Sequence, residues 1–472
     1  MAMTSSSHQL ASPGRRPDLR PVRRRLERLE RRFAAGEFSD TNYLTGPILY
    51  QYPAMMVPAL QGAVLDAVLT AAPNNFLLDP FLGSGTSLVE ALSRSCPSFG
   101  IDVNPLAVVI AKAKLGPYQL DALQGAIDVV QERITRDRGT VIEVRFPGLW
   151  AWYRKDVAIR LSRIRRAIEN VDRRTDRRFL WVCLAETARI CSNSRLTTVK
   201  LHKRPDNQMA RSLDVLEIFS TIVERNLKAL SDLATELRES NLLLPGGYPS
   251  QAAQVVRADV RSGILDHAMP SGGFGVMLTS PPYGDNTSTV PYGQATYLAT
   301  SWINGDDLAA DTGVSSLTNA YETDAHSLGG SRVGALKAVD ELCQRSPSFS
   351  LATDELKSHK RDRLVRVSCF IRDLDEALGR IRSVLAPGAM QVITLGNRNV
   401  GGIEIPLSEI VSELSIDAGA TLVKAMVRDL PSRRRAAARN DRAPRMSQEW
   451  ILVIRAELSP QRPGSGGIVE AA

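Results

Sequence analysis

Short apolar runs alternate along the chain with longer stretches in which apolar residues recur at helical spacing. The apolar runs predict buried strands over residues 75–78, 98–102, 255–258, 275–278, 389–395, 421–427 and 450–455. The helical spacing predicts helices over residues 86–95, 106–114, 161–169, 213–237, 373–385 and 407–414. Strands that alternate with helices in this way predict an α/β fold.

A glycine-containing loop follows the first predicted strand. Residues 79–86 read Asp-Pro-Phe-Leu-Gly-Ser-Gly-Thr. Pro80 ends the strand because it cannot donate to a ladder, and Gly83 and Gly85 permit a tight turn close to a ligand. Open α/β sheets bind nucleotides at such a strand–loop–helix junction. Taken alone, the motif also fits a structural turn, since it lacks the third glycine of the dinucleotide fingerprint and the lysine of a P-loop.

An acidic residue follows the second predicted strand. Asp102 ends residues 98–102, about twenty residues after the glycine loop, where nucleotide-binding folds place a carboxylate that accepts from ribose hydroxyls. The alternative is that Asp102 only caps the helix that follows Asn104 and Pro105.

A second motif, Ser-Pro-Pro-Tyr at residues 280–283, ends the predicted strand 275–278. Two consecutive prolines fix φ and remove two N–H donors, so their carbonyls remain as acceptors in a rigid loop. Such acceptors suit an exocyclic amine, and Tyr283 is placed to stack on a base drawn out of its helix. The alternative is a simple Pro-Pro turn that closes a strand.

Together and in this order, the two motifs resemble those of the amino-group DNA methyltransferases, which act on cytosine N4 or adenine N6, and specifically their Ser-Pro-Pro-Tyr branch. The resemblance covers residues 46–115 and 251–457. It implies an S-adenosylmethionine-dependent methyltransferase fold, which is Rossmann-like, with a seven-stranded, mostly parallel sheet whose final strand is antiparallel. It also implies methyl transfer from S-adenosyl-L-methionine to cytosine N4 in a specific sequence of double-stranded DNA.

The resemblance assigns roles to individual residues. It implies that Tyr52 and Pro53 pack on the methionine part of the cofactor and that Asp259 contacts the adenine. The full implied sets are, for the cofactor, Tyr52, Pro53, Asp79, Phe81, Gly83, Gly85, Thr86, Asp102 and Asp259, and for catalysis, Ser280, Pro281, Pro282 and Tyr283.

The first residue of the second motif bears on the substrate. In the family, Ser before Pro-Pro is typical of cytosine-N4 enzymes, whereas Asp or Asn is typical of adenine-N6 enzymes and of many RNA guanine methyltransferases. Ser280 therefore favours cytosine N4. The resemblance also implies a restriction-modification or phage-defence system, with a cognate nuclease as partner. The alternatives are an adenine-N6 DNA or guanine-N2 RNA methyltransferase, and an inactive nucleic-acid-binding protein on the same scaffold.

Two segments depart from a minimal fold of this kind. Residues 116–250 separate the second and third predicted strands and are mostly helical in pattern. They form either a target-recognition domain or a structural helical cap. Residues 287–360 follow the second motif and have an irregular, polar pattern, which predicts a substrate-facing lid without regular structure.

Basic residues are clustered in a chain whose net charge is +8, from 59 Lys and Arg against 51 Asp and Glu. One cluster lies within a basic N-terminal arm (residues 1–45), where apolar spacing predicts a short helix. A second occupies residues 428–445 and includes Arg433, Arg434 and Arg435, and a third includes Lys200 and Arg204. Arginine and lysine runs bind phosphates without reading sequence, so the last two clusters are candidate DNA contacts. The alternative for each is a solvated face.

Length, composition and cysteine spacing bear on the number of domains, on metal binding and on the cellular location. The 472 residues allow two to three domains, and 458–472 is a Pro/Gly-rich tail predicted to be disordered. The five cysteines are scattered and lack Cys-x-x-Cys spacing, and the five histidines form no cluster. We therefore expect a reducing, cytoplasmic setting without a metal site. Without an apolar run of transmembrane length or a signal-peptide core, we expect no membrane association.

Overall fold

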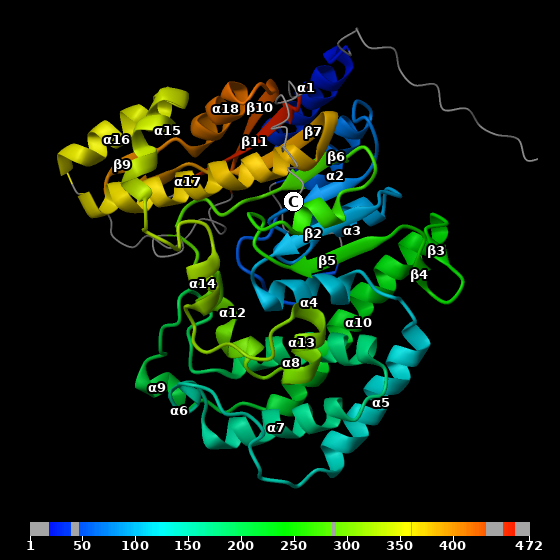
Figure 1. The fold of residues 1–472 in the computed structure, drawn as a ribbon. Helices are drawn as coiled ribbons and strands as arrows, with labels where there is room; N and C mark the ends of the chain where they lie inside the picture. The colour runs from blue at the N-terminus through cyan, green and yellow to red at the C-terminus, as the bar shows by residue number, and fades with distance from the viewer. Residues whose placement is uncertain (1–17, 39–46, 286–288, 360, 431–446, 458–472) are drawn as a thin grey trace, which may run out of the picture.

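A seven-stranded sheet forms the centre of the molecule in this computed structural model, which describes residues 18–38, 47–285, 289–359, 361–430 and 447–457 (Figure 1). The strand order is β10-β11-β7-β6-β1-β2-β5. The bounds are β1 (Leu77–Asp79), β2 (Ser98–Asp102), β5 (Ala253–Arg257), β6 (Phe274–Thr279), β7 (Leu385–Leu395), β10 (Thr421–Asp429) and β11 (Gln448–Arg455). Neighbouring strands pair in parallel, except that β11 is antiparallel to both β7 and β10. The predicted methyltransferase fold with an antiparallel final strand is confirmed.

Both faces of the sheet are buried, which explains why the strands read as continuous apolar runs. Side chains of a strand alternate between the faces. Leu77 and Val276 join the core on one face, whereas Leu78 and Met277 join the core on the other. The first face is covered by α1 (Arg20–Ala34), α2 (Pro58–Leu69), α3 (Thr86–Leu92) and α4 (Pro105–Lys114). The second is covered by α11 (Ile264–Ala268), α17 (Arg361–Val384) and α18 (Leu407–Asp417).

The basic N-terminal segment contains the predicted helix, α1. Val22, Leu26 and Leu29 recur on its buried face and join the core beside α2 and β10. An ion pair of 2.7 Å between Glu30 and Lys424 of β10 also holds the helix. The exposed side therefore carries most of the arginines.

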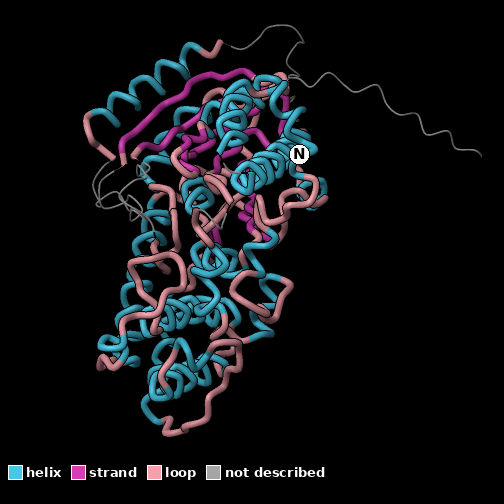
Figure 2. Tube along the Cα trace, turned by 90° about the vertical axis from the view of Figure 1, so that its left-hand side faces the viewer, coloured by secondary structure: helices cyan, strands magenta, loops and turns pink. Residues whose placement is uncertain are grey.

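The long insertion between β2 and β5 forms a helical layer below the sheet in Figure 1, and the quarter-turn of Figure 2 shows the same arrangement from the side. It consists of α5 (Leu120–Arg136), α6 (Leu149–Trp152), α7 (Lys155–Glu169), α8 (Arg174–Cys191), α9 (Asp206–Met209) and α10 (Val215–Glu239), followed by the small hairpin of β3 (Leu243–Leu244) and β4 (Tyr248–Pro249). Its buried side chains belong to the same core as the first face of the sheet.

Two helices that follow the second motif also belong to this layer: α12 (Tyr292–Thr300) and α13 (Gly305–Thr312). Trp181 Nε1 donates to Asp307 Oδ2 at 2.8 Å, and Arg177 binds the same carboxylate through both oxygens at 2.7 Å. Arg178 binds Asp311 in the same bidentate way. Charge-assisted, bidentate pairs are strong and directional. They join segments that lie about 130 residues apart in the chain.

The prediction that residues 287–360 lack regular structure is wrong for the part that the structure describes. Besides α12 and α13, this part contains α14 (Glu322–His326), the 3-10 helix η2 (Ala335–Ala338), α15 (Val339–Arg345) and α16 (Pro347–His359). Apart from α16, these helices have nine residues or fewer, which is too short for a clear helical period in the sequence. The start of α13 is fixed locally, because Asn304 accepts from the backbone N–H groups of Asp306 and Asp307.

The carboxyl ends of the parallel strands lie at one edge of the sheet, which we call the catalytic edge. β10 is parallel to β7, so the connection from β10 to β11 begins and ends at this edge too. Residues 431–446 of that connection, including the predicted DNA contacts Arg433, Arg434 and Arg435, lie outside the described residues, as does the predicted tail, 458–472. None of the described helices has the length and apolar character that crossing a membrane requires.

Candidate active site

The glycine loop after β1 adopts a tight turn that two glycines make possible. Gly83 and Gly85 have φ of 52° and 82°, a region that favours glycine. Gly85 also packs against α4, because a Cβ there would lie 2.8 Å from Cβ of Ala111. Gly85 is therefore required by packing as well as by conformation.

Asp79 ties the glycine loop to the end of β6. Its carboxylate accepts from the N–H of Phe81 at 3.1 Å and from Oγ1 of Thr279 at 2.6 Å, and also from the Ser87 hydroxyl. The side chain is fully buried, and this burial raises its pKa to about 6. Asp79 thus holds the loop against the residue that precedes Ser280, instead of facing the cleft.

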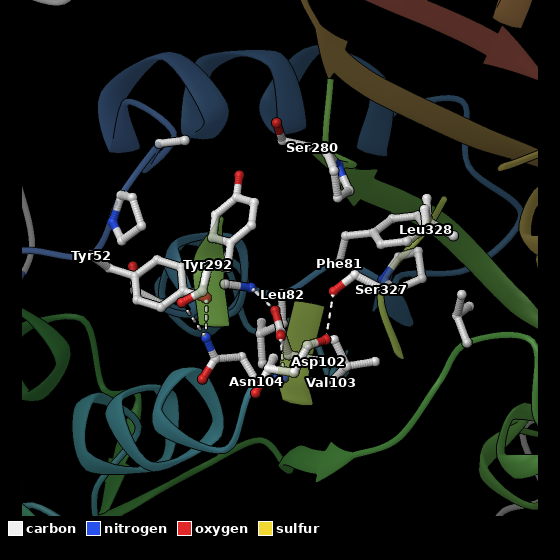
Figure 3. Close-up of a pocket in the computed structure, with 18 of the residues that line it drawn as sticks. Tyr52, Phe81, Leu82, Asp102, Val103, Asn104, Ser280, Tyr292, Ser327 and Leu328 are labelled. Atoms are coloured by element: carbon white, nitrogen blue, oxygen red, sulfur yellow. Dashed lines mark hydrogen bonds between the residues drawn. The ribbon is translucent and has the colours of Figure 1, made fainter. Parts of the chain in front are cut away.

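Asp102 holds the same loop from the other side. Its Oδ2 accepts from the N–H of Gly83 at 2.7 Å, and its Oδ1 accepts from the N–H of Asn104 at 2.8 Å. Figure 3 shows Asp102 beneath Phe81 and Leu82. Burial raises the pKa of Asp102 to about 6. A carboxylate has about four acceptor sites and these backbone bonds do not use all of them, so Asp102 can accept further from a ligand in the cleft. The helix cap that was the alternative role belongs to Asn104, whose side chain accepts from the N–H of Leu106.

Asn104 connects three segments of the site that are far apart in sequence. Its buried amide donates to Oγ1 of Thr296 at 3.0 Å, to the hydroxyl of Tyr52 at 3.3 Å and to the carbonyl of Tyr292 at 3.4 Å. The rings of Tyr52 and Tyr292 stack with centroids 5.9 Å apart (Figure 3). The Tyr52 segment is therefore fixed to α4 and α12.

Asp259 follows β5 and pairs with Arg261 at 2.6 Å. Arg261 also contacts Asp373 of α17, at 3.1 Å. Burial opposes ionisation of Asp259, but the hydrogen bonds and the positive charge of Arg261 outweigh it, so the pKa of Asp259 lies below its usual value. Asp259 is a carboxylate at neutral pH.

The Ser-Pro-Pro-Tyr loop emerges from β6 at the catalytic edge. The Ser280 hydroxyl donates to the Tyr283 hydroxyl at 3.3 Å, and the latter donates to Oε1 of Glu449 in β11 at 3.1 Å. Arg428 of β10 binds the other oxygen of Glu449, with Nε at 2.9 Å. Burial, together with the charge of Glu449, raises the pKa of Tyr283 well above its usual value.

These loops enclose a cleft with about 820 Å³ of empty space, part of it open to solvent. The predicted residues that line it are Tyr52, Pro53, Phe81, Gly83, Thr86, Asp102, Asp259, Ser280 and Pro282. Asp79, Gly85, Pro281 and Tyr283 are not among its lining residues. The first two lie behind the glycine loop, and Tyr283 is turned toward β11.

The sequence reasoning missed one wall of the cleft. Tyr292 lines it from α12, and Thr323, His326, Ser327 and Leu328 line it from α14 and the turn that follows. Figure 3 shows Tyr292 facing the cleft beside Tyr52, and Ser327 and Leu328 near Phe81. No local motif marks these residues, because they come from the segment that was predicted to be irregular. Asn104 was visible only as the residue before a helix-starting proline.

Comparison with known proteins identifies a relative along most of the chain. The Type II methyltransferase M.MvaI of Kocuria varians is 29% identical over 394 residues, which are 81% of this chain and 84% of that protein. The chain is therefore similar to a Type II methyltransferase over most of its length. A second relative, the Type II methyltransferase M.MjaII of Methanocaldococcus jannaschii, is 40% identical over 76 residues, which are 16% of this chain and 14% of that protein. No family profile matches the chain.

Among solved structures, an rRNA methyltransferase, aviRa of Streptomyces viridochromogenes, aligns with 88% of this chain and 93% of its own, at 14% identity and a TM-score of 0.28. A likeness at this level carries no argument about fold or function. The fold assignment above rests on the strand order and directions.

The third basic cluster lies on a hairpin-like loop, residues 193–204, beside the missed wall. Backbone N–H groups of Arg195 and Arg204 donate across it to His202 and Asn193, each at 2.8 Å. Lys200 lies close enough to Asp324 of α14 to lower its pKa, although burial dominates and raises that pKa to about 6. The loop of residues 193–204 itself contains no acidic residue. Lys200 thus lies near α14, and Arg204 belongs to the same loop. Within the described residues, no group of three or more His, Cys, Asp or Glu is arranged to hold a metal ion.

Proposed function

We propose that this protein transfers a methyl group from S-adenosyl-L-methionine to the exocyclic N4 of cytosine in a specific sequence of double-stranded DNA. The observation that carries the proposal is that the glycine loop after β1 and the Ser-Pro-Pro-Tyr loop after β6 meet in one cleft, with Ser280 and Pro282 on its wall. The similarity to Type II methyltransferases supports DNA as the substrate and a restriction-modification or defence system, with a cognate nuclease, as the setting.

The groups on the cleft wall fit a sulfonium nucleoside. Asp102 offers two acceptor oxygens for ribose hydroxyls, and Asp259 offers a carboxylate for an adenine amine. Tyr52, Pro53 and Phe81 supply apolar surface, and the turn at Gly83 opens toward Tyr52. When bound, S-adenosyl-L-methionine supplies a methyl group that its sulfonium makes electrophilic.

The chain's own task is to hold the target amine in line with that methyl group, which is a problem of positioning. Ser280 donates its hydroxyl hydrogen to Tyr283, so its lone pairs are free to accept from an amine in the cleft. The Pro281 carbonyl is the proposed second acceptor, because the two prolines fix the backbone that carries it. Hydrogen-bond acceptors of the protein that bind the N–H groups of the amine raise the electron density at the attacking nitrogen. The Tyr283 ring, which is partly exposed but lies outside the cleft lining, is the proposed stacking surface for a base extruded from the duplex.

Two basic elements are proposed to contact the DNA backbone: the loop with Lys200 and Arg204, and the run with Arg433, Arg434 and Arg435. Arg195 and Lys203 are exposed on the first element. The second belongs to residues 431–446, and the described end of β10 and start of β11 on either side of it lie at the catalytic edge. If the run binds phosphates, replacing its three arginines with Ala should flatten the salt dependence of DNA binding by about 0.9 per lost contact and leave sequence preference intact. An unchanged salt slope would mean a solvated loop.

The decisive experiment is to incubate the protein with S-adenosyl-L-methionine and DNA, and to identify the methylated nucleoside by mass spectrometry. N4-methylcytosine is the expected product. N6-methyladenine, or a product found only with RNA, would replace the proposed substrate while keeping the chemistry. Absence of cofactor binding by calorimetry would instead support an inactive nucleic-acid-binding protein.

A further inference from the structure

Tyr283 is held at the far end of its side chain by a residue of another strand. Its hydroxyl donates to Oε1 of Glu449, 166 residues later in the chain, at 3.1 Å. The prolines fix the backbone before Tyr283, but they leave its side-chain torsions free. A hydrogen bond at the hydroxyl therefore restrains the ring in a way that the loop itself does not.

Glu449 is itself fixed, and its two oxygens have separate partners. Arg428 lies directly across from it in the β10–β11 ladder and binds Oε2 through Nε at 2.9 Å and through a second guanidinium nitrogen. The side chains of Arg428 and Glu449 are 7% and 16% exposed. This pair is complete without Tyr283, because it uses only Oε2. The contact between Oε1 and the tyrosine hydroxyl is therefore not needed to neutralise Arg428.

The direction of each hydrogen bond follows from the carboxylate. An ionised carboxylate only accepts, so the Tyr283 hydroxyl must donate its one hydrogen to Glu449. Any further partner of this hydroxyl must therefore donate to its oxygen. The Ser280 hydroxyl then donates to that oxygen, at 3.3 Å. The lone pairs of Ser280 are left for the cleft, where an amine N–H would bind. Chains of this kind polarise their members cooperatively.

We propose that Glu449, held by Arg428, is a positioning residue for methyl transfer: it orients the Tyr283 ring and keeps Ser280 as an acceptor toward the target amine. This inference rests on the proposed function, and it assigns a role to the antiparallel strand β11 that the two motifs do not suggest.

The test combines Tyr283→Phe, Glu449→Gln and the double variant. Single-turnover methyl transfer is measured at saturating cofactor and DNA, and cofactor affinity is measured by calorimetry. Tyr283→Phe keeps the ring and the Arg428–Glu449 pair, and removes only the hydroxyl. We expect each single variant to lower the transfer rate about tenfold, which corresponds to about one hydrogen bond, with cofactor affinity unchanged. The double variant should be no slower than the slower single variant, because both break one chain.

Glu457→Gln is the matched control. Glu457 follows β11 and accepts from Thr421 at 2.8 Å, at the opposite end of the strand. The Glu457→Gln variant should transfer methyl groups at the wild-type rate. Melting temperatures show whether Glu449→Gln destabilises the fold by leaving Arg428 without a charged partner. If it does, Tyr283→Phe decides alone.

Two outcomes would overturn the inference: Tyr283→Phe at the wild-type rate, or additive losses in the double variant. The failure of the proposed function looks different, because the wild-type protein would then bind no cofactor or yield no methylated nucleoside.

Discussion

The two walls of the cleft are built in different ways. One wall consists of the loops after β1, β2, β5 and β6, whose positions follow from the parallel register of the sheet. The other consists of Tyr292 in α12 and of residues 323–328, which depend on contacts made by buried polar side chains. The Asn104 amide donates hydrogen bonds to Thr296 and to the carbonyl of Tyr292 in α12, and Asp324 accepts from the N–H of Gly293 at 2.8 Å.

This difference separates two tasks. The sheet wall carries the charged and acceptor groups that can hold a nucleoside, and strand pairing keeps them in place in the absence of a ligand. The helical wall adds Tyr292, Leu328 and the uncharged or weakly basic side chains of Thr323, His326 and Ser327, and closes the site. We therefore expect losses on the sheet wall to remove most of the binding free energy, and losses on the helical wall to act through packing.

The largest effect is expected from Asp102→Ala. It should remove two hydrogen bonds to ribose, worth about 1.5–3 kcal/mol each for a charged acceptor, and so weaken cofactor binding by about a hundredfold or more. Calorimetry measures the affinity, and melting of the cofactor-free protein controls for the lost bonds to Gly83 and Asn104. An unchanged affinity would contradict the ribose role.

The same carboxylate predicts a pH dependence. Because burial raises the pKa of Asp102 to about 6, the carboxylate should be ionised above that pH and protonated below it. The ionised carboxylate accepts hydrogen bonds from hydroxyls more strongly than the protonated acid does, so cofactor affinity should be constant at neutral pH and fall as the pH drops through 6. Asp102→Asn should bind weakly and lack this dependence. A pH dependence retained in Asp102→Asn would assign it to another group.

The next effect concerns the support of the sheet wall. Lys114 is the last residue of α4, beneath the glycine loop, and its amino group lies 3.3 Å from the Ser84 hydroxyl. The side chain is buried, and this burial lowers the pKa of Lys114 to about 7. The unfolded chain holds this proton up to about pH 10.4, so between about 7 and 10.4 it binds more protons than the folded one. Stability should therefore rise with pH in this window.

Lys114→Met should remove that cost. The free energy of unfolding should increase near pH 7.5, at about 1.4 kcal/mol per pKa unit as an upper limit, and the gain should shrink toward pH 10. Urea unfolding at several pH values measures it. A loss of stability at pH 7.5 would mean that the charged form has a partner beyond Ser84.

A smaller effect is expected where the two walls join. Asn104→Ala should remove the cap of α4 and the bonds to Tyr52 and Thr296, and lower stability by about 2 kcal/mol. Cofactor affinity should fall with it, because the Tyr52 segment loses its attachment. If affinity falls while stability does not, Asn104 contacts the cofactor instead of joining the walls.

The smallest effect is expected on the helical wall itself. His326→Ala removes one side chain from the cleft near Asp259 and should weaken cofactor binding by less than tenfold, without changing DNA affinity. His267→Ala, on the exposed side of α11, is the matched control. A loss of cofactor affinity as large as that of Asp102→Ala would show that the helical wall contributes as much binding free energy as the sheet wall. The proposed difference between the two walls would then be wrong.

The sequence by itself determined the sheet wall. Apolar runs, prolines and glycines act over a few residues, so β1, its glycine loop, β2 with Asp102 and the Ser-Pro-Pro-Tyr loop were placed correctly along the chain. Once these strands are parallel, their carboxyl ends must meet at one edge, and the cleft follows. The order of the motifs also indicated the antiparallel final strand through the family resemblance.

Only the tertiary structure decided the rest. Most of the helices between Tyr292 and His359 are short, and α13 is held in place by Arg177 and Trp181, which are far away in sequence. The turn of Tyr283 toward Glu449, the burial of Lys114 and the joining role of Asn104 likewise depend on which segments pack together. Local periodicity carries no information about such pairings, because their free energy comes from contacts between residues that a linear pattern leaves unconnected.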